Sequence, residues 1–198
     1  MSRNILIATS NPGKFQQMKT FLEELNFKFL NLKDFAFDEE PKENGETFEE
    51  NAIIKAKFYF EKLKIPVIAE DSGILVDAFP NELGVKTRRW GAGEKASDEQ
   101  WISYFMEKMK DVPLKNRGAS FVSCVVFING KGIKSFQGEC QGIITNNLEA
   151  PIEAGIPLSS CFKPEKYDKV YAALSKDEKL SVSHRGKAAE KLKKWLTH

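Results

Sequence analysis

A strand, a tight turn and a helix follow one another near the N-terminus of the chain. The apolar run Ile5-Leu6-Ile7-Ala8 predicts a buried strand, and the apolar residues after the turn recur at helical spacing. Those residues are Phe15, Met18, Phe21, Leu22 and Leu25. Because units of this kind build sheets with parallel strands, this one restricts the chain to folds that combine strands with helices.

The turn is Thr9-Ser10-Asn11-Pro12-Gly13-Lys14, and a segment of similar character, Ser183-His184-Arg185-Gly186-Lys187, opens the predicted last helix. Each joins small, turn-forming residues to a cation at the start of a helix. Backbone N–H groups and the helix dipole favour phosphate at such a place. Two interpretations of the first turn stay open: a phosphate site, or an ordinary connection in which Lys14 is a solvated surface charge.

The turn differs from a P-loop at two positions. A P-loop reads G-x-x-x-x-G-K-[ST], whereas this chain has Ala8 at the first glycine and Phe15 at the final hydroxyl residue. That hydroxyl is a Mg²⁺ ligand in P-loop enzymes. A metal-dependent reaction on a nucleotide would therefore require carboxylates elsewhere in the chain.

Helices and strands alternate in the first part of the chain, and a hairpin follows later. Capping boxes at Thr47–Glu50 and Ser97–Gln100 each predict the start of a helix. The sequence as a whole predicts an α/β fold with a mixed sheet. Pro66–Ala69 predicts a short strand that runs into a turn at Glu70-Asp71-Ser72-Gly73. Asn129-Gly130 predicts a hairpin, and His184–Leu196 predicts a last helix in which Trp195 is buried.

Composition limits the kinds of partner. At 198 residues, the chain is expected to form a single domain over 1–198. Its net charge of +2 is too small to indicate a nucleic-acid or membrane surface, and no stretch reaches the ~18 apolar residues of a membrane span. Three cysteines without ligand spacing, Cys124, Cys140 and Cys161, indicate reduced thiols in a packed interior. We therefore expect a cytoplasmic protein with no stable nucleic-acid or membrane partner.

Acidic residues in predicted turns supply the ligand type that Mg²⁺ prefers. Glu43 and Glu46 lie in an acidic loop, for which a solvated surface run is the alternative interpretation. Glu70 and Asp71 are flanked by apolar segments, so their charges require a metal, a lysine or a helix N-terminus as partner. The chain has two histidines, one of them the final His198, which disfavours zinc sites and Ser-His-Asp chemistry. A phosphate turn and a carboxylate pair together indicate metal-assisted attack of water on a phosphoryl group.

Five motifs follow one another along nearly the whole chain. They are Thr9–Lys14, Thr47-Phe48-Glu49-Glu50-Asn51-Ala52 with Lys55-Ala56, Ala69-Glu70-Asp71-Ser72-Gly73, Arg89-Trp90 and Ser183-His184-Arg185-Gly186-Lys187-Ala188. Together they resemble the inosine triphosphate pyrophosphatase family. The resemblance implies a two-lobed α/β fold, with a long mixed β-sheet flanked by helices and a substrate cleft between the lobes. It also implies a homodimer, a Mg²⁺ cofactor and a single domain that hydrolyses noncanonical purine nucleoside triphosphates (ITP, dITP, XTP) to the monophosphate and pyrophosphate, cleansing the nucleotide pool.

The resemblance also implies roles for individual residues. The turn Thr9–Lys14 would bind the triphosphate, with Lys14 also acting in catalysis. Glu43 and Asp71 would hold the metal, and Asp71 would accept the proton of the attacking water. The further substrate contacts that the resemblance implies are Lys55, Ser72, Lys179, His184 and Arg185.

One loop departs from the family pattern, Gly-Phe-Gly-(Tyr, Trp or Phe)-Asp-Pro-x-Phe, which packs an aromatic ring on the purine. Here the stretch is Gly155-Ile156-Pro157-Leu158-Ser159-Ser160-Cys161-Phe162, so Ile156 replaces the stacking Phe and Ser159 replaces the Asp. Any cation that the Asp would pair with must find another partner. We expect hydrolysis to persist. Selectivity for ITP and XTP over GTP and ATP is expected either to be weaker than the family norm or to depend more heavily on His184 and Arg185.

Two other functions are compatible with the same fold. One is a nucleotide-binding module with reduced catalysis, and the other is a phosphatase of broader specificity that releases orthophosphate. A basic last helix, with Lys187, Lys191, Lys193 and Lys194, would support a binding module that tracks a phosphate backbone. Three of these lysines flank Leu192 and Trp195, as is typical of a solvated helix face, and a pure binding module needs neither Glu43 nor Asp71.

Overall fold

The structure is a computed structural model that describes residues 4–93 and 95–197, without the side chains of Arg88 and Arg89. The side chain of Arg89, which belongs to the fourth motif, therefore lies outside what is described. The strands are β1 (Asn4–Ala8), β2 (Lys28–Asn31), β3 (Val67–Val76), β4 (Gly118–Asn129), β5 (Gly132–Ile144) and β6 (Phe162–Pro164). The α-helices are α1 (Pro12–Phe21), α2 (Phe48–Leu63), α3 (Asp98–Met109), α4 (Lys176–Val182) and α5 (His184–Thr197). Short 3₁₀ helices lie at Leu32–Asp34, Gly84–Arg89, Leu114–Asn116, Pro157–Ser160 and Tyr171–Ala173.

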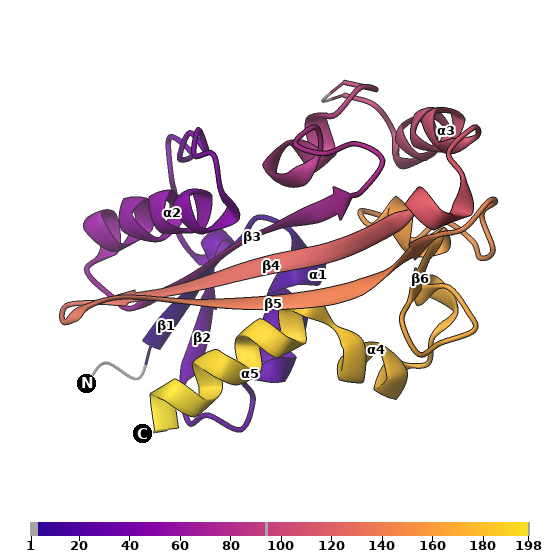
Figure 1. Cartoon of the computed structure of the whole chain (residues 1–198). Helices are drawn as coiled ribbons and strands as arrows, with labels where there is room; N and C mark the ends of the chain where they lie inside the picture. The colour runs from indigo at the N-terminus through magenta and orange to yellow at the C-terminus, as the bar shows by residue number, and fades with distance from the viewer. Residues whose placement is uncertain (1–3, 94, 198) are drawn as a thin grey trace. The chain divides into compact units, whose positions relative to one another are not determined.

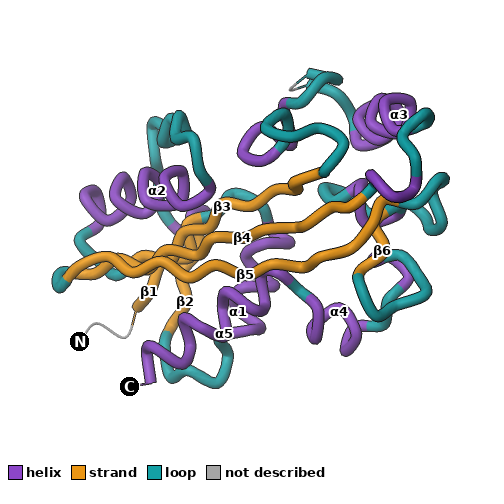
Figure 2. The backbone as a smooth tube through the Cα atoms, in the orientation of Figure 1, coloured by secondary structure: helices purple, strands orange, loops and turns teal. Residues whose placement is uncertain are grey.

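The strands form one mixed sheet in the order β2-β1-β3-β4-β5-β6 (Figures 1 and 2). β1 pairs in parallel with β2 and with β3, whereas β5 and β6 are antiparallel. In the β1–β3 register, Ala8 lies opposite Ala69. The turn after β1 and the carboxylates after Ala69 therefore lie at the same edge of the sheet. The predicted α/β class with a mixed sheet flanked by helices is confirmed.

The middle of β3 differs from the prediction. The residues Glu70-Asp71-Ser72-Gly73 were expected to form a turn between two short strands, but β3 continues through them from Val67 to Val76. Turn-forming composition is a local preference, and pairing with neighbouring strands overrides it here. Successive side chains of a strand point to opposite faces of the sheet. Glu70 and Asp71, which are consecutive in β3, therefore lie on opposite faces.

Contacts divide the described chain into two compact units. The first comprises the described parts of Met1–Ser72, Ser123–Gly138 and His184–His198, and the second comprises Gly73–Val122 and Glu139–Ser183. The two predicted lobes match these units, whereas the predicted single domain and substrate cleft stay predictions.

Both faces of the sheet in the first unit are covered. Ile5 and Ile7 pack with residues of α1 and α5, and Leu6 and Ala8 pack with residues of α2 on the other face. Figure 1 shows α2 on one side of the strands and α1 and α5 on the other. This alternation explains why β1 is apolar and buried from Ile5 to Ala8, as expected for a strand covered on both faces.

The second unit has a core of its own. Its largest buried side chains include Trp101 and Phe105 of α3, whose rings stack, and Phe162 of β6. At its start, α3 is capped by Ser97 and Gln100 as predicted. Among the described residues, no helix combines the length and the apolar composition that crossing a membrane requires.

Two further predictions can be compared with the structure. All three cysteines are buried thiols, and burial raises the pKa of Cys124 and of Cys161 to about 12, as expected for packing residues. Trp195 was expected to be buried, yet it is 40% exposed at the end of α5, although its ring contacts Phe127 and Phe136. The last turn of a helix has fewer neighbours to cover such a large side chain.

Candidate active site

The turn between β1 and α1 is held by the side chain of Asn11. Its Oδ1 accepts hydrogen bonds from the backbone N–H groups of Gly13 (2.9 Å) and Lys14 (3.1 Å), and Pro12 occupies the first helical turn. A Cβ at Gly13 would lie 3.2 Å from this oxygen, so a glycine leaves room for the cap. Thr9 Oγ1 in turn accepts from the N–H of Asn11 at 3.2 Å. The predicted strand, turn and helix are confirmed, with Ser10 exposed at the bend.

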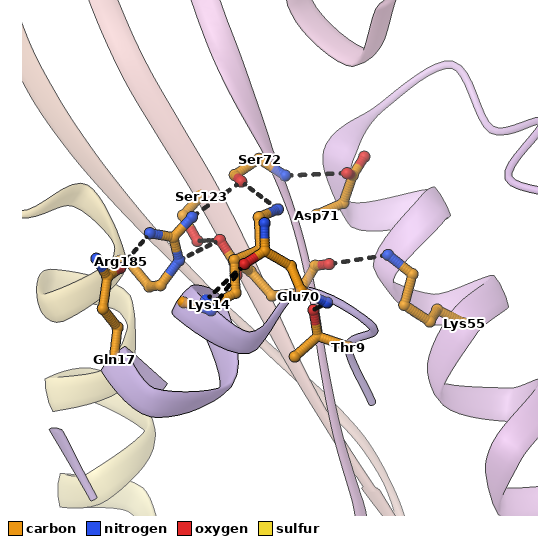
Figure 3. A network of polar contacts seen from close by, with 11 residues as sticks. Thr9, Lys14, Gln17, Lys55, Glu70, Asp71, Ser72, Ser123 and Arg185 are labelled. Atoms are coloured by element: carbon orange, nitrogen blue, oxygen red, sulfur yellow. Dashed lines mark hydrogen bonds and ion pairs between the residues drawn. The ribbon is translucent and has the colours of Figure 1, made fainter. Parts of the chain in front are cut away.

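Lys14 points from this turn toward β3. Its half-buried ammonium donates to Ser72 Oγ at 3.0 Å (Figure 3). Burial lowers the pKa of Lys14, and the charge of Glu70 opposes that change. Lys14 thus contacts a residue of another motif, so the interpretation of its ammonium as a solvated surface charge is wrong.

Glu70 is a buried carboxylate with two hydrogen-bond partners. Arg185 Nε donates to its Oε1 at 2.8 Å, and Ser123 Oγ donates to the same oxygen at 3.0 Å. Burial alone would raise the pKa of Glu70, but the charges of Arg185 and Lys14 outweigh burial and hold this pKa well below its ordinary value. The requirement for a partner that the sequence indicated is therefore met by an arginine and a serine.

Asp71 is half-buried and is held by two donors. Its Oδ1 accepts from the N–H of Ser72 at 3.0 Å, and its Oδ2 accepts from Asn51 Nδ2 at 3.2 Å. Burial raises the pKa of Asp71; the charge of Lys55 opposes this rise, and the charge of Glu43 adds to it. The carboxylate is thereby oriented by the protein while it stays open to further partners.

Glu43 and Lys55 complete this end of the site. Lys55, on α2, donates to Glu43 Oε2 at 3.0 Å and to the backbone oxygen of Glu70 at 3.1 Å. The acidic loop therefore holds a specific ion pair through Glu43, whereas Glu46 is an exposed residue beside the helix cap. The buried Asn51 fixes this loop, because its Oδ1 accepts from the N–H of Gly45 at 2.8 Å.

The donor set around Asp71 fits a divalent cation. Glu43 and Asp71 repel each other electrostatically, and both present the hard carboxylate oxygens that Mg²⁺ prefers. Over the described residues, no group of three or more His, Cys, Asp or Glu side chains gathers to hold a metal by itself. Two carboxylates match the usual mode of Mg²⁺, which keeps several waters and takes its other ligands from substrate phosphates.

His184 and Arg185 begin α5 and are both buried. Burial, with the positive charge of Arg185, lowers the pKa of His184 to about 3, so the imidazole is neutral at pH 7. The first turn of α5 approaches β5 closely at Gly138, where a Cβ would lie only 2.0 Å from the backbone oxygen of His184. A larger residue at Gly138 would therefore displace the two predicted site residues.

Three predicted substrate contacts belong to the second unit. Ile156 is exposed, and its backbone oxygen accepts from the N–H of the buried Ser159 at 3.0 Å. Ser159 Oγ donates to Glu153 at 3.3 Å, and Lys179 Nζ lies 2.6 Å from the same carboxylate and over the ring of Tyr171. Ser159, which replaces the Asp of the family pattern, carries no charge. Glu153 instead supplies the negative charge that pairs with Lys179.

The sequence analysis did not predict four residues of these networks: Gln17, Ser123, Glu153 and Asn51, which donates a hydrogen bond to Asp71. Ser123 carries a readable signal, because it is a polar residue within the apolar run of β4. Asn51 lies in a motif but on an unremarkable helical position, and neither Gln17 nor Glu153 differs from an ordinary surface residue in sequence.

A comparison with protein-family models decides the family. The model of the Ham1 family matches residues 5–195. The chain belongs to the Ham1 family. Relatives of this Ham1 protein include the dITP/XTP pyrophosphatase of Bacillus cereus, 36% identical over 193 residues, which are 96% of this chain and 93% of the relative. Another is the dITP/XTP pyrophosphatase of Leptospira interrogans, which is 35% identical over 196 residues. These residues are 99% of this chain and 98% of the relative. The resemblance predicted from the five motifs is confirmed.

Solved structures of Ham1 proteins share the fold. The Staphylococcus aureus Ham1 protein matches with a TM-score of 0.85 and 33% identity, over 98% of both chains. A HAM1 protein from Coxiella burnetii matches with a TM-score of 0.88 and 30% identity, over 100% of this chain and 99% of that one. The fold of these Ham1 structures therefore extends over nearly all of the residues that the structure describes.

Proposed function

We propose that this Ham1 protein hydrolyses the noncanonical purine nucleoside triphosphates ITP, dITP and XTP to the monophosphate and pyrophosphate. The observation that carries the proposal is the meeting, within one unit, of a phosphate-type turn with a carboxylate pair. Lys14 at the turn touches Ser72, whose backbone N–H binds Asp71. Relatives of nearly the same length carry the name dITP/XTP pyrophosphatase, which supports this substrate class.

The triphosphate is proposed to bind at the turn Thr9–Lys14. Backbone N–H groups at the start of α1 and the positive end of its dipole attract phosphate oxygens. Lys14, Lys55 and Arg185 supply three positive charges in the same unit, and these offset most of the charge of a triphosphate. Lys14 is also proposed to stabilise charge that develops during the reaction.

Glu43 and Asp71 are proposed to hold Mg²⁺. When bound, the metal supplies polarisation of the phosphoryl group and neutralises negative charge on it. Asp71 orients the attacking water and accepts its proton, because Asn51 and the N–H of Ser72 fix the carboxylate in place. The new bond joins the water oxygen to the α-phosphorus, the bond from that phosphorus to the bridging oxygen breaks, and pyrophosphate leaves.

The base is proposed to contact Ile156, Ser159, Lys179 and His184. An aliphatic side chain at Ile156 covers a base but forfeits the ~1–3 kcal/mol of aromatic stacking. A neutral His184 can donate one hydrogen bond from one ring nitrogen and accept one at the other. Selectivity for ITP and XTP over GTP and ATP is therefore proposed to be weaker than in relatives that keep the aromatic residue.

We also propose that the protein acts as a cytoplasmic homodimer whose partner is the nucleotide alone. The resemblance to the family supports the dimer. The net charge of +2 gives no indication of a nucleic-acid or membrane surface.

The proposal is tested by incubating the protein with ITP, dITP, XTP, GTP and ATP, each with and without Mg²⁺, and identifying the products. Monophosphate and pyrophosphate from ITP, dITP and XTP, formed only with Mg²⁺, are expected. Orthophosphate as the first product would instead indicate a phosphatase. Binding of ITP without turnover would indicate a nucleotide-binding module.

A further inference from the structure

The hydroxyl of Ser72 lies between two cations (Figure 3). Lys14 Nζ donates to Ser72 Oγ at 3.0 Å, and Arg185 Nη2 donates to it at 3.3 Å. A serine hydroxyl has two acceptor lone pairs and one donor hydrogen. Both acceptor positions are taken, and no acceptor for the hydrogen is found in the part of the chain that the structure describes. The hydroxyl is thus a donor that points away from both cations.

The orientation of Arg185 depends on a buried carboxylate. Its side chain is 8% exposed and that of Glu70 is 6% exposed, with Arg185 Nε 2.8 Å from Glu70 Oε1. A second N–H, from Nη1, donates to Gln17 at 2.6 Å. Two fixed bonds and a planar guanidinium determine where its remaining nitrogen, Nη2, meets Ser72.

Glu70 is itself held in place from β4. Ser123 Oγ donates to the same Oε1 that accepts from Arg185, at 3.0 Å. The chain of contacts therefore runs from Ser123 to Glu70, on to Arg185 and then to Ser72. Every member belongs to the first unit.

We propose that Glu70 is a positioning residue which, by holding Arg185, keeps the Ser72 hydroxyl aimed as a hydrogen-bond donor at an anionic oxygen of the substrate. The inference rests on the proposed function, which supplies the triphosphate as that anion. A donor fixed in advance needs no reorganisation when negative charge develops on the phosphoryl group. Glu70 thus acts through Arg185 and Ser72, in contrast to its neighbour Asp71, which acts on water.

The test compares Glu70→Gln, Ser72→Ala and the double variant, with kcat and KM measured on ITP at saturating Mg²⁺. Each single variant is expected to lower kcat/KM by about tenfold or more, mainly through kcat. The kcat/KM of the double variant is expected to lie within about twofold of that of the less active single variant, because both changes remove the same donor. Additive losses, or a folded Glu70→Gln protein with the wild-type kcat/KM, would overturn the proposal.

Since Glu70→Gln leaves Arg185 without its counter-charge and can unfold the chain, Ser123→Ala provides a second variant. It removes one hydrogen bond to Glu70 and keeps every charge. We expect it to lower kcat about threefold in the wild-type background and not at all in the Ser72→Ala background. Ser135→Ala is the matched control, because it removes a Ser–Glu hydrogen bond to the exposed Glu49 and should change neither background. An equal effect of Ser123→Ala in both backgrounds contradicts the proposal.

Two other outcomes remain distinguishable. A wild-type protein that turns over no nucleoside triphosphate contradicts the proposed function itself. A Glu70→Gln protein that regains the full rate when Mg²⁺ is raised above the concentration that saturates the wild type would make Glu70 a metal ligand, which overturns its role as a positioning residue.

Discussion

The ammonium of Lys55 lies 3.0 Å from the Glu43 carboxylate. Burial raises the pKa of Asp71, and there the charge of Lys55 opposes the rise while that of Glu43 adds to it. Lys55 therefore supplies the positive charge that a divalent cation would bring to the same two carboxylates. If Glu43 and Asp71 hold the metal as proposed, the metal and Lys55 would compete for Glu43, and the ammonium of Lys55 would become available to the phosphates.

Replacing Lys55 should therefore separate metal binding from catalysis. Lys55→Met is expected to bind Mg²⁺ about fivefold more tightly in the absence of nucleotide, which corresponds to the ~1 kcal/mol of a partly exposed ion pair. It should nevertheless hydrolyse ITP more slowly, because a charge that offsets the triphosphate is lost. Calorimetric titration with Mg²⁺ and a kinetic assay measure the two effects, with the exposed Lys57→Met on the same helix as control. Unchanged Mg²⁺ affinity in Lys55→Met would refute this competition.

Asp71→Asn is expected to retain the fold and to lose activity. The amide is nearly isosteric, and its one oxygen can still accept from the N–H of Ser72, whereas the amino group that replaces Oδ2 cannot accept from Asn51. It cannot take the proton of water, so kcat on ITP should fall by about 10² or more. Circular dichroism checks the fold, and the exposed Asp38→Asn is the control. A wild-type rate in Asp71→Asn would remove Asp71 from the mechanism.

How much of the fold and of the site the sequence predicts depends on how far apart along the chain the interacting residues lie. The turn cap at Asn11 and the capping box at Thr47 are local, because the residues involved lie within three positions of one another, and both regions were predicted. The run Glu70–Gly73 was misassigned as a turn, since strand pairing outweighed its local preference. The Glu70–Arg185 pair joins residues 115 positions apart. No periodicity or spacing indicates such a pair, although the need of Glu70 for a partner was predictable.

His184 should make the folded chain sensitive to mild acid. Burial, with the charge of Arg185, lowers the pKa of His184 from 6.5 to about 3. Between these two values the unfolded chain binds a proton that the folded chain does not. Stability is therefore complete above about pH 6.5 and falls as pH is lowered, by at most about 1.4 kcal/mol per pH unit.

Urea unfolding at about pH 7 and about pH 5.5 measures this loss in the wild type and in His184→Asn, which should lose most of the pH dependence. Asp71 acts with the opposite sign, because burial raises its pKa and the folded chain holds that proton more tightly. Equal slopes in wild type and His184→Asn would count against a buried neutral imidazole.

Base selectivity should respond to the rebuilt loop in a defined way. Ile156→Phe restores a ring and should raise kcat/KM for ITP by about fivefold or more, with Ile156→Ala as the control in the opposite direction. Ser159→Asp alone would place a second carboxylate beside Glu153, so it should be combined with Glu153→Gln to keep one charge next to Lys179. The ratio of kcat/KM for ITP over ATP is measured beside that of the Bacillus cereus relative. A higher ratio in the wild-type chain than in the relative would contradict weakened selectivity.

The most direct test of the central claim is to run the hydrolysis of ITP with Mg²⁺ in ¹⁸O-labelled water and to locate the label by ³¹P NMR. Water that is oriented by Asp71 and attacks the α-phosphorus leaves ¹⁸O in the monophosphate and none in the pyrophosphate. We predict this result, and we predict its loss in Asp71→Asn. Label in pyrophosphate, or in orthophosphate as the first product, would contradict the account.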